Sequence, residues 1–343
     1  MKIKSKIRDY EVKFSNNLNF NYDYYLIDKI VYKLHYKKFK FIDKDKIIFI
    51  SAHEENKAYL RCAYYIQNLI DAGLKRGNTL CAIGGGITQD ISGFISSILY
   101  RGVDWVFYPT TLLAQCDSCI GGKTSINLSS FKNIVGNFNP PKEIIVNTDF
   151  LATLKCEEIQ SGIGEIIKVA FLDNEKRIDY NDIINSIKSD HVAIDLIKKS
   201  LQIKKEIIEI DEFDKGLRNI MNYGHTFGHA IEALTKFNIP HGIAVGLGVD
   251  IANNISKLVF NDNSAGMDSV LKSFLAKNRV YVSTFADYYN QEKYIQILKK
   301  DKKNTDAKSI NCILNNFKGS TIKKKINVSE LKVLLTESIR HDK

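Results

Sequence analysis

Apolar and polar positions follow two alternating patterns along the first half of the chain. Short apolar runs, in KIIFISA (46–52), TLCAIGGG (79–86) and DWVFYP (104–109), are typical of buried strands. Between them, EENKAYLRCAYYIQNLIDAGL (54–74) and DISGFISSILYRG (90–102) repeat apolar residues at helical spacing and end at or beside glycine. Strands and helices in alternation predict a parallel sheet with crossover helices.

The pattern changes in the second half. The stretches 157–172, 180–210 and 226–237 all have helical periodicity, and strand-like runs are few. We therefore expect two domains: an α/β domain with a parallel sheet over residues 1–150, and a mostly helical domain over residues 151–343. A chain of this length is compatible with two domains.

Composition narrows the class of protein. The chain has 44% hydrophobic and 26% charged residues, typical of a soluble globular protein. No apolar run approaches the ~20 residues of a membrane span, and the first residues, MKIKSKIRDYEVKF, lack the apolar stretch of a secretory signal. We expect a cytoplasmic protein with no membrane partner.

The net charge of +10 raises the hypothesis of a nucleic-acid partner, and the cysteines raise that of a redox-active pair. The excess lysines are dispersed, and no aromatic-basic RNA motif or zinc-finger spacing accompanies them, so we expect no nucleic-acid partner. The charge suits a solvated surface or the attraction of a small anion. Of six cysteines only Cys116 and Cys119 are close in sequence. Reduced, buried thiols explain them better than a redox pair does.

The stretch GGGITQD begins with three glycines, Gly84 to Gly86, after an apolar run. Glycines let a backbone approach a pyrophosphate, and the following helix offers its first N–H groups. The signal is weak when taken alone, because it is not the spaced Rossmann pattern and a tight turn without a ligand fits equally well.

Two further stretches carry polar groups suited to an anionic ligand. PTTLLAQCDSCIGGKTSIN (109–127) contains hydroxyls, a carboxylate and a lysine that follows two glycines, and FKNIVG adds a lysine and an asparagine. Glu165 and Lys168 are spaced i, i+3 on an otherwise apolar helix. Such a pair is usually a surface salt bridge, but here we expect both charges to face a cleft or a partner.

Histidines gather in the second half of the chain. The chain has seven histidines, and three of them, His225, His229 and His241, fall close together amid glycines. Arg218 and Asn222 extend a polar stripe with the first two, at i, i+4, i+7 and i+11. The sequence HTFGH lacks the glutamate of the HExxH zinc motif. Two or three of these histidines with a carboxylate would form a zinc site with an open position.

These stretches together resemble a known family. The order and spacing of GGGITQD–SGF, RGVDWVFYPTTLLAQCDSCIGGK, KNIVG, SGIGEIIK, LRNIMNYGHTFGHAIE and HGIAV are similar to those of the sugar phosphate cyclases, and most of all to 3-dehydroquinate synthases. The resemblance runs from about Ser51 to Asn253, with a weaker match at DKKN (301–304). It implies an N-terminal NAD-binding domain and a C-terminal helical domain that binds metal and substrate, usually in a homodimer.

The resemblance also implies a reaction. In that family, 3-deoxy-D-arabino-heptulosonate 7-phosphate becomes 3-dehydroquinate and phosphate, a step of the shikimate pathway to aromatic amino acids. The reaction is a lyase reaction with no net redox change: transient oxidation by NAD, elimination of phosphate, re-reduction, and closure by an intramolecular aldol step. One divalent metal, zinc or cobalt, assists.

The matching positions imply a set of site residues. The metal ligands are Glu165, His225 and His241. The NAD contacts are Glu54, Lys57, Gly84, Gly85, Gly86, Asp90, Thr110, Thr111, Lys123, Lys132 and Thr153. The contacts to the substrate phosphate are Arg101, Lys123, Asn133, His229 and one of Lys302 or Lys303. Those to the substrate carboxylate and hydroxyls are Lys204, Arg218 and Asn222, and Asp117 and Lys168 match further catalytic positions.

Several positions depart from the family pattern, and they keep other functions open. The departures are Gln89 and Ser125 in place of glycine, Cys119, Lys155, Asp214 and Ile243. One alternative is a cyclase for a different sugar phosphate, in cyclitol or surface-polysaccharide synthesis. A more distant one is a metal-dependent alcohol dehydrogenase of the same superfamily, and a basic binding protein is the non-enzyme alternative. The retained Lys204 and Arg218 favour a substrate that carries a carboxylate.

Overall fold

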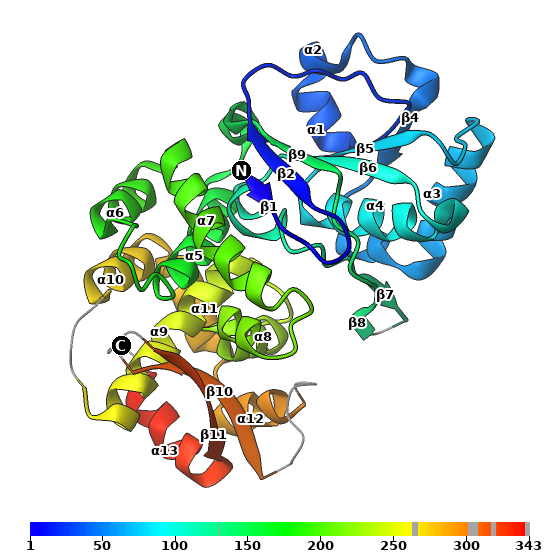
Figure 1. Ribbon diagram of the computed structural model, residues 1–343. Helices are drawn as coiled ribbons and strands as arrows, with labels where there is room; N and C mark the ends of the chain where they lie inside the picture. The colour runs from blue at the N-terminus through cyan, green and yellow to red at the C-terminus, as the bar shows by residue number, and fades with distance from the viewer. Residues whose placement is uncertain (130, 263–266, 301–307, 317–319, 340–343) are drawn as a thin grey trace. The chain divides into compact units, whose positions relative to one another are not determined.

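A computed structural model describes residues 1–129, 131–262, 267–300, 308–316 and 320–339 (Figure 1). The chain divides into two compact units, Met1–Leu154 and Lys155–Lys343. Lys302 and Lys303, which the sequence nominates for phosphate binding, lie outside the described residues.

The first unit is built on a seven-stranded sheet with the order β1-β2-β9-β6-β5-β3-β4. All neighbouring strands are parallel except β1 and β2. The strands are β1 (Lys2–Ile3), β2 (Tyr10–Phe14), β3 (Tyr24–Asp28), β4 (Ile47–Ile50), β5 (Thr79–Gly84), β6 (Asp104–Pro109) and β9 (Glu143–Val146). The central strands β5 and β6 are buried almost throughout, which is why they appear in the sequence as continuous apolar runs.

Helices pack on this sheet, as the alternating pattern predicts. They are α1 (Lys29–Leu34), α2 (Tyr36–Phe39), α3 (Tyr59–Asp71) and α4 (Gly86–Ile98). One face of the sheet packs against α1 and α2 through a cluster that includes Tyr25, Ile27, Ile83 and Phe39. The long helix α4 packs against β5, β6 and β3. A small antiparallel pair, β7 (Ile126–Leu128) and β8 (Phe131–Val135), completes the unit.

The second unit is mainly helical, which confirms the predicted fold class. Its helices are α5 (Cys156–Ala170), α6 (Tyr180–Ser189), α7 (Ile194–Ile210), α8 (His225–Leu234), α9 (His241–Phe260), α10 (Asp268–Lys277), α11 (Arg279–Tyr288), α12 (Gln291–Lys299) and α13 (Val328–Ser338). The helix α9 is long and apolar enough to cross a membrane by composition, but 67% of its most apolar stretch is buried within the protein. It is therefore a core helix, packed by α5 and α8.

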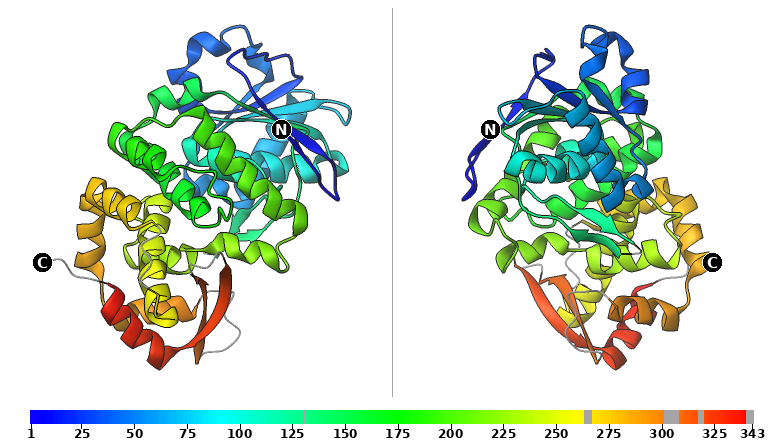
Figure 2. Two further views of the ribbon diagram at one scale, coloured as in Figure 1. Left: turned by 60° about the vertical axis from the view of Figure 1, so that its left-hand side comes forward. Right: turned by 90° about the vertical axis from the view of Figure 1, so that its right-hand side faces the viewer.

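A hairpin that the sequence did not predict lies in the second unit. Strands β10 (Ser309–Asn315) and β11 (Thr321–Asn327) pair antiparallel, beside α12 and α13 (Figure 2). Three consecutive lysines stand in the middle of β11, and the strand is largely exposed. A solvent-facing strand of this kind gives no apolar pattern for sequence analysis to detect.

Candidate metal centre and cofactor-binding turn

Three helices of the second unit bring one carboxylate and two histidines together. Glu165 lies on α5, His225 is the first residue of α8, and His241 is the first residue of α9. The Nε2 atoms of His225 and His241 lie 3.5 Å and 3.2 Å from the same oxygen, Oε1 of Glu165. The three ligands that the sequence predicts therefore converge on one point.

His229 also belongs to this cluster. It lies one turn after His225 on α8, and the ligand atoms of the three histidines lie within 4.8 Å of one another. His229 is exposed, whereas Glu165 is almost fully buried. If Glu165, His225 and His241 bind the metal, His229 is the histidine of this cluster that faces solvent and can contact a substrate.

A second carboxylate orients one of the histidines. Oε2 of Glu232, on α8, lies 3.2 Å from Nδ1 of His241. A carboxylate at Nδ1 accepts the N–H of that nitrogen and fixes the ring, so that Nε2 faces Glu165. Sequence reasoning missed Glu232, although it lies three residues after His229 in HTFGHAIE.

Burial and neighbouring charges shift the pKa values of the residues in this cluster. Burial alone would raise the pKa of Glu165, but Lys168, whose Nζ lies 2.6 Å from Oε2, and the two histidines hold it well below its usual range. Burial lowers the pKa of His225, which keeps that imidazole in the neutral, metal-binding form. For His241, burial is outweighed by Glu165 and Glu232, which raise its pKa to about 10.

Glycines allow the helices to approach closely enough for this geometry. The N–H of Gly242 on α9 donates to Oγ of Ser161 on α5 at 2.9 Å. A Cβ atom on Gly242 would lie 1.8 Å from the carbonyl oxygen of Ser161. Only glycine fits there, and the contact places the start of α9 directly against the helix that carries Glu165.

The remaining predicted residues of this unit lie on two other elements. Lys204 is on α7 and Arg218 is in a 3-10 segment, Leu217–Asn222, and both are buried. The predicted polar stripe through Asn222 and His225 is wrong as a single helical face. The 3-10 segment ends at Asn222, and Gly224, with φ +77°, is the N-cap of α8, which starts at His225. The backbone of Arg218 is held by the end of α7, since its N–H donates to Oδ2 of the C-cap residue Asp211 at 3.0 Å.

In the first unit, the glycine turn connects β5 to α4. Gly84 ends the strand, Gly85 is the N-cap and makes no side-chain cap, and Gly86 starts the helix. A Cβ atom on Gly85 would lie 2.9 Å from Cγ2 of Thr111, and the N–H of Thr110 donates to the carbonyl of Gly84 at 2.9 Å. The two motifs GGG and PTT are therefore in direct contact.

This turn fits a dinucleotide phosphate. The first N–H groups of α4 point out of the helix beside a backbone without side chains. Oγ1 of Thr110 is buried and has no hydrogen-bond partner within the described residues. A buried hydroxyl next to a helix N-terminus is suited to a polar ligand group.

A polar network joins other predicted cofactor residues. Nζ of Lys57 lies 2.7 Å from Oδ2 of Asp90 and donates to Oδ1 of Asn133 at 2.5 Å. Burial raises the pKa of Asp90 although Lys57 opposes the shift. Asn127, which the sequence did not single out, accepts from the N–H of Asn133 and donates to Oε1 of Glu54, at 2.9 and 2.8 Å.

Other predicted residues lie apart from the turn. Arg101 follows the C-terminal end of α4, and a helix of this length separates it from Gly86 by about 20 Å. Oγ1 of Thr153 is 2.8 Å from Nε2 of His35. Lys123 and Lys132 are exposed near the β7–β8 pair.

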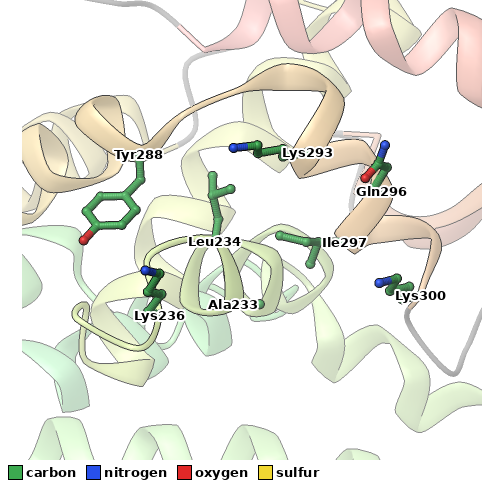
Figure 3. Close-up of a pocket in the computed structure, with 8 residues that line it drawn as sticks. All are labelled: Ala233, Leu234, Lys236, Tyr288, Lys293, Gln296, Ile297 and Lys300. Atoms are coloured by element: carbon green, nitrogen blue, oxygen red, sulfur yellow. The ribbon is translucent and has the colours of Figure 1, made fainter.

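A pocket of about 490 Å³ lies elsewhere in the second unit, between α8, α11 and α12 (Figure 3). Its lining comprises Ala233, Leu234, Lys236, Tyr288, Lys293, Gln296, Ile297 and Lys300. It contains none of the predicted site residues. Its three lysines are exposed, and Lys236 and Lys300 stand just beyond the C-terminal ends of α8 and α12, where cations complement the helix dipole.

Comparison with known proteins gives a consistent result. The N-terminal 3-dehydroquinate synthase family profile matches residues 47–161, and the C-terminal profile matches residues 162–304. A 3-dehydroquinate synthase of Clostridium tetani is 31% identical over 98% of this chain and 90% of its own length. One of a Thermoanaerobacter species is 38% identical over 77% of this chain and 74% of its own length.

A solved structure shares the fold. It is that of a 2-deoxy-scyllo-inosose synthase complexed with carbaglucose-6-phosphate, NAD+ and Co2+, with a TM-score of 0.82 and 21% identity over 98% of this chain and 99% of that one. At this identity the likeness concerns the fold. The two family profiles and the identity to the curated relatives decide the family: the chain belongs to the 3-dehydroquinate synthases.

Proposed function

We propose that this protein is an NAD- and divalent-metal-dependent lyase that converts 3-deoxy-D-arabino-heptulosonate 7-phosphate to 3-dehydroquinate and phosphate. The observation that carries the proposal is the convergence of His225 and His241 on one oxygen of the buried Glu165. Membership of the family supports the same reaction.

Glu165, His225 and His241 would hold the metal. One anionic oxygen and two imidazole nitrogens form the three-ligand set of catalytic zinc, which leaves a fourth position for substrate. Cobalt accepts the same donors. Glu232 would fix the tautomer of His241, and Lys168 would keep Glu165 ionised and in place.

NAD would lie on the glycine turn of the first unit. Gly84, Gly85 and Gly86 allow its phosphates to approach, and Thr110 offers a buried hydroxyl. The network of Glu54, Lys57 and Asp90 would bind polar groups of the cofactor, and Thr111, Lys123, Lys132 and Thr153 complete the proposed contacts. The chemistry that bound NAD and metal supply is reversible hydride transfer and polarisation of the reacting C–O group.

The chain's own side chains would bind and orient the substrate. Arg101, Lys123, Asn133 and His229 would hold the phosphate, and Lys204, Arg218 and Asn222 would hold the carboxylate and hydroxyls. Arginine pairs with a carboxylate through two parallel hydrogen bonds, which fixes the orientation of the substrate. Lys168 and Asp117 would stabilise charge and hold protons near the reacting carbon.

The test is a direct assay. Purified protein with NAD+ and zinc or cobalt is incubated with 3-deoxy-D-arabino-heptulosonate 7-phosphate, and phosphate and 3-dehydroquinate are measured separately. We expect equal amounts of both, with no net NADH. Bound NAD and metal without turnover would reject this substrate.

A cyclase for another sugar phosphate is the second candidate, because the solved structure that shares the fold is a 2-deoxy-scyllo-inosose synthase complexed with carbaglucose-6-phosphate. The buried Lys204 and Arg218 support the carboxylate-bearing substrate instead. Arg218→Lys keeps the positive charge but loses the two parallel hydrogen bonds of the guanidinium group, so it should raise KM for a substrate with a carboxylate. A substrate without one should be unaffected.

We also propose that the protein works as a cytoplasmic homodimer, as its family membership suggests. Light scattering of the purified protein at assay concentration would test this. A mass near 39.0 kDa, that of one chain, would contradict the dimer.

A further inference from the structure

Gln89 follows the glycine turn and lies in the first turn of α4, with 5% of its surface exposed. Its backbone N–H donates to the carbonyl of Gly85 at 3.0 Å, which closes that turn of helix. Its side chain leaves the helix and bonds to a different segment.

The partner is Ser118, through two reciprocal hydrogen bonds. Nε2 of Gln89 donates to the backbone carbonyl of Ser118 at 2.7 Å, and Oγ of Ser118 donates to Oε1 of Gln89 at 2.7 Å. A glutamine amide can donate and accept at the same time, whereas an ionised glutamate of the same length can only accept. The two groups on Ser118 thus require an amide.

Ser118 is the last residue of a short π-helix, Ala114–Ser118. The start of this π-helix is also held by an amide, since Nε2 of Gln115 donates to the carbonyls of Pro109 and Asn147 at 3.0 and 2.8 Å. Single π-turns are frequent at functional sites because they displace side chains from a regular helix. This one is therefore fixed to the strand ends by Gln115 and to α4 by Gln89.

The π-helix carries Asp117, which is 8% exposed. A Cβ atom on Gly86, the first residue of α4, would lie 4.0 Å from Oγ of Ser118. The serine, which follows Asp117 directly in the chain, therefore lies beside the glycine turn. A shift of Ser118 would therefore shift the segment that carries Asp117 relative to the glycine turn.

We propose that Gln89 is a positioning residue, which holds the Asp117-bearing π-helix at a set distance from the glycine turn. The inference rests on the proposed function, because it assigns both segments to one cofactor and substrate site. Gln89 acts through Ser118 and does not itself contact the cofactor or the substrate.

The test compares Gln89→Ala and Gln89→Glu with the wild type. We measure the Kd of NAD+ by calorimetry, kcat and KM at saturating NAD+, and hydrogen–deuterium exchange of the amides of residues 114–119. Both variants should exchange these amides faster and lose about tenfold or more in kcat, since small misplacements of catalytic groups have such effects. Substrate KM should change much less.

A matched control separates positioning from general loss of stability. Ser96→Ala removes a buried hydroxyl from the other half of α4, which donates to Gly93 and accepts from Asn139. It should lower the melting temperature without changing exchange in residues 114–119 or kcat. Ser118→Ala combined with Gln89→Ala should add little to Gln89→Ala alone, because both remove the same contact.

The outcomes distinguish this inference from the proposed function. A wild type that neither binds NAD+ nor converts the substrate would remove both. An active wild type whose Gln89→Ala and Gln89→Glu variants match it in exchange and kcat would overturn the inference alone. Strict additivity in the double variant would also overturn it.

Discussion

A Cβ atom placed on Gly164 would lie 1.9 Å from the carbonyl oxygen of Gly242. Gly164 precedes the proposed metal ligand Glu165, and Gly242 follows the proposed ligand His241. Because neither glycine has a side chain, the backbones of α5 and of the start of α9 are in direct contact. This contact sets the distance between Glu165 and His241.

Gly164→Ala should therefore weaken metal binding as well as the fold. The new methyl group must push α9 away, and overpacking of this kind costs roughly 1–3 kcal/mol or more. We expect a lower melting temperature and less zinc per chain by elemental analysis. Gly77→Ala is the control, because a Cβ there meets nothing within 4 Å. Full zinc content in Gly164→Ala would show that the contact does not set the ligand geometry.

Glu232→Ala should lower zinc affinity by about 10- to 100-fold, since an outer carboxylate orients the ligating histidine. Glu232→Gln should lose less, because its amide oxygen can still accept from Nδ1 of His241. Competition with a chromophoric chelator measures the Kd. Glu209→Ala is the control, since Glu209 pairs with Lys205 on α7. Equal affinity in wild type and Glu232→Ala would contradict the role.

The sequence was enough to propose Glu165, His225 and His241 as metal ligands, whereas it gave no reason to propose Glu232. Histidine and glutamate are common metal ligands, so their residue types and their match to a family motif are enough to suggest the role. Glu232 gains its role only because α9 doubles back on α8 and places His241 beside it. That contact depends on close packing of helices at glycines, and no periodic pattern in the sequence reveals such packing.

Backbone conformation and tertiary contacts explain two other features that the sequence did not predict. The spacing of Asn222 and His225 suits a helix, but Gly224 adopts a positive φ and interrupts it. The network of Lys57, Asp90 and Asn133 joins a 3-10 segment, α4 and β8, and only tertiary structure brings these elements together. The alternation of strands and helices in the first unit, by contrast, is local and was predicted correctly.

Asp190 should make stability depend on acid pH. It caps α6 with φ 52° and accepts from Gln160 and Lys277, both at 2.6 Å. Burial alone would raise the pKa of Asp190, but Lys277, Gln160 and Cys156 lower it below its usual value. Its stabilising contribution is therefore complete above the unfolded pKa of about 3.9 and is lost as pH falls through the folded pKa.

Asparagine tolerates the left-handed conformation, so Asp190→Asn removes the charge without straining the backbone. This variant should be less stable than the wild type at pH 7. The difference should shrink as the pH falls toward about 3, where the wild-type carboxyl becomes protonated too. Urea denaturation at several pH values measures it. Asp195→Asn is the control, since its side chain is 70% exposed. A difference that does not change with pH would exclude the ion pair as its cause.

Metal removal should leave the protein folded. Glu165 is buried, but Nζ of Lys168 lies 2.6 Å from one of its oxygens and both histidines lie near the other, so its charge is compensated without an ion. We expect chelation to lower the melting temperature while the far-ultraviolet circular dichroism is retained. A bound ion adds stability that grows with the logarithm of its concentration over its Kd.

Lys168→Met should change this response. It leaves Glu165 buried with one fewer cation, which costs about 3–5 kcal/mol when a buried pair is broken. Zinc can replace the missing positive charge, so added zinc should raise the melting temperature of Lys168→Met by more than that of the wild type. Scans with and without chelator measure both shifts. A metal-free wild type that loses its helical signal, or a zinc shift equal in the two proteins, would mean that Lys168 does not balance the carboxylate in the absence of metal.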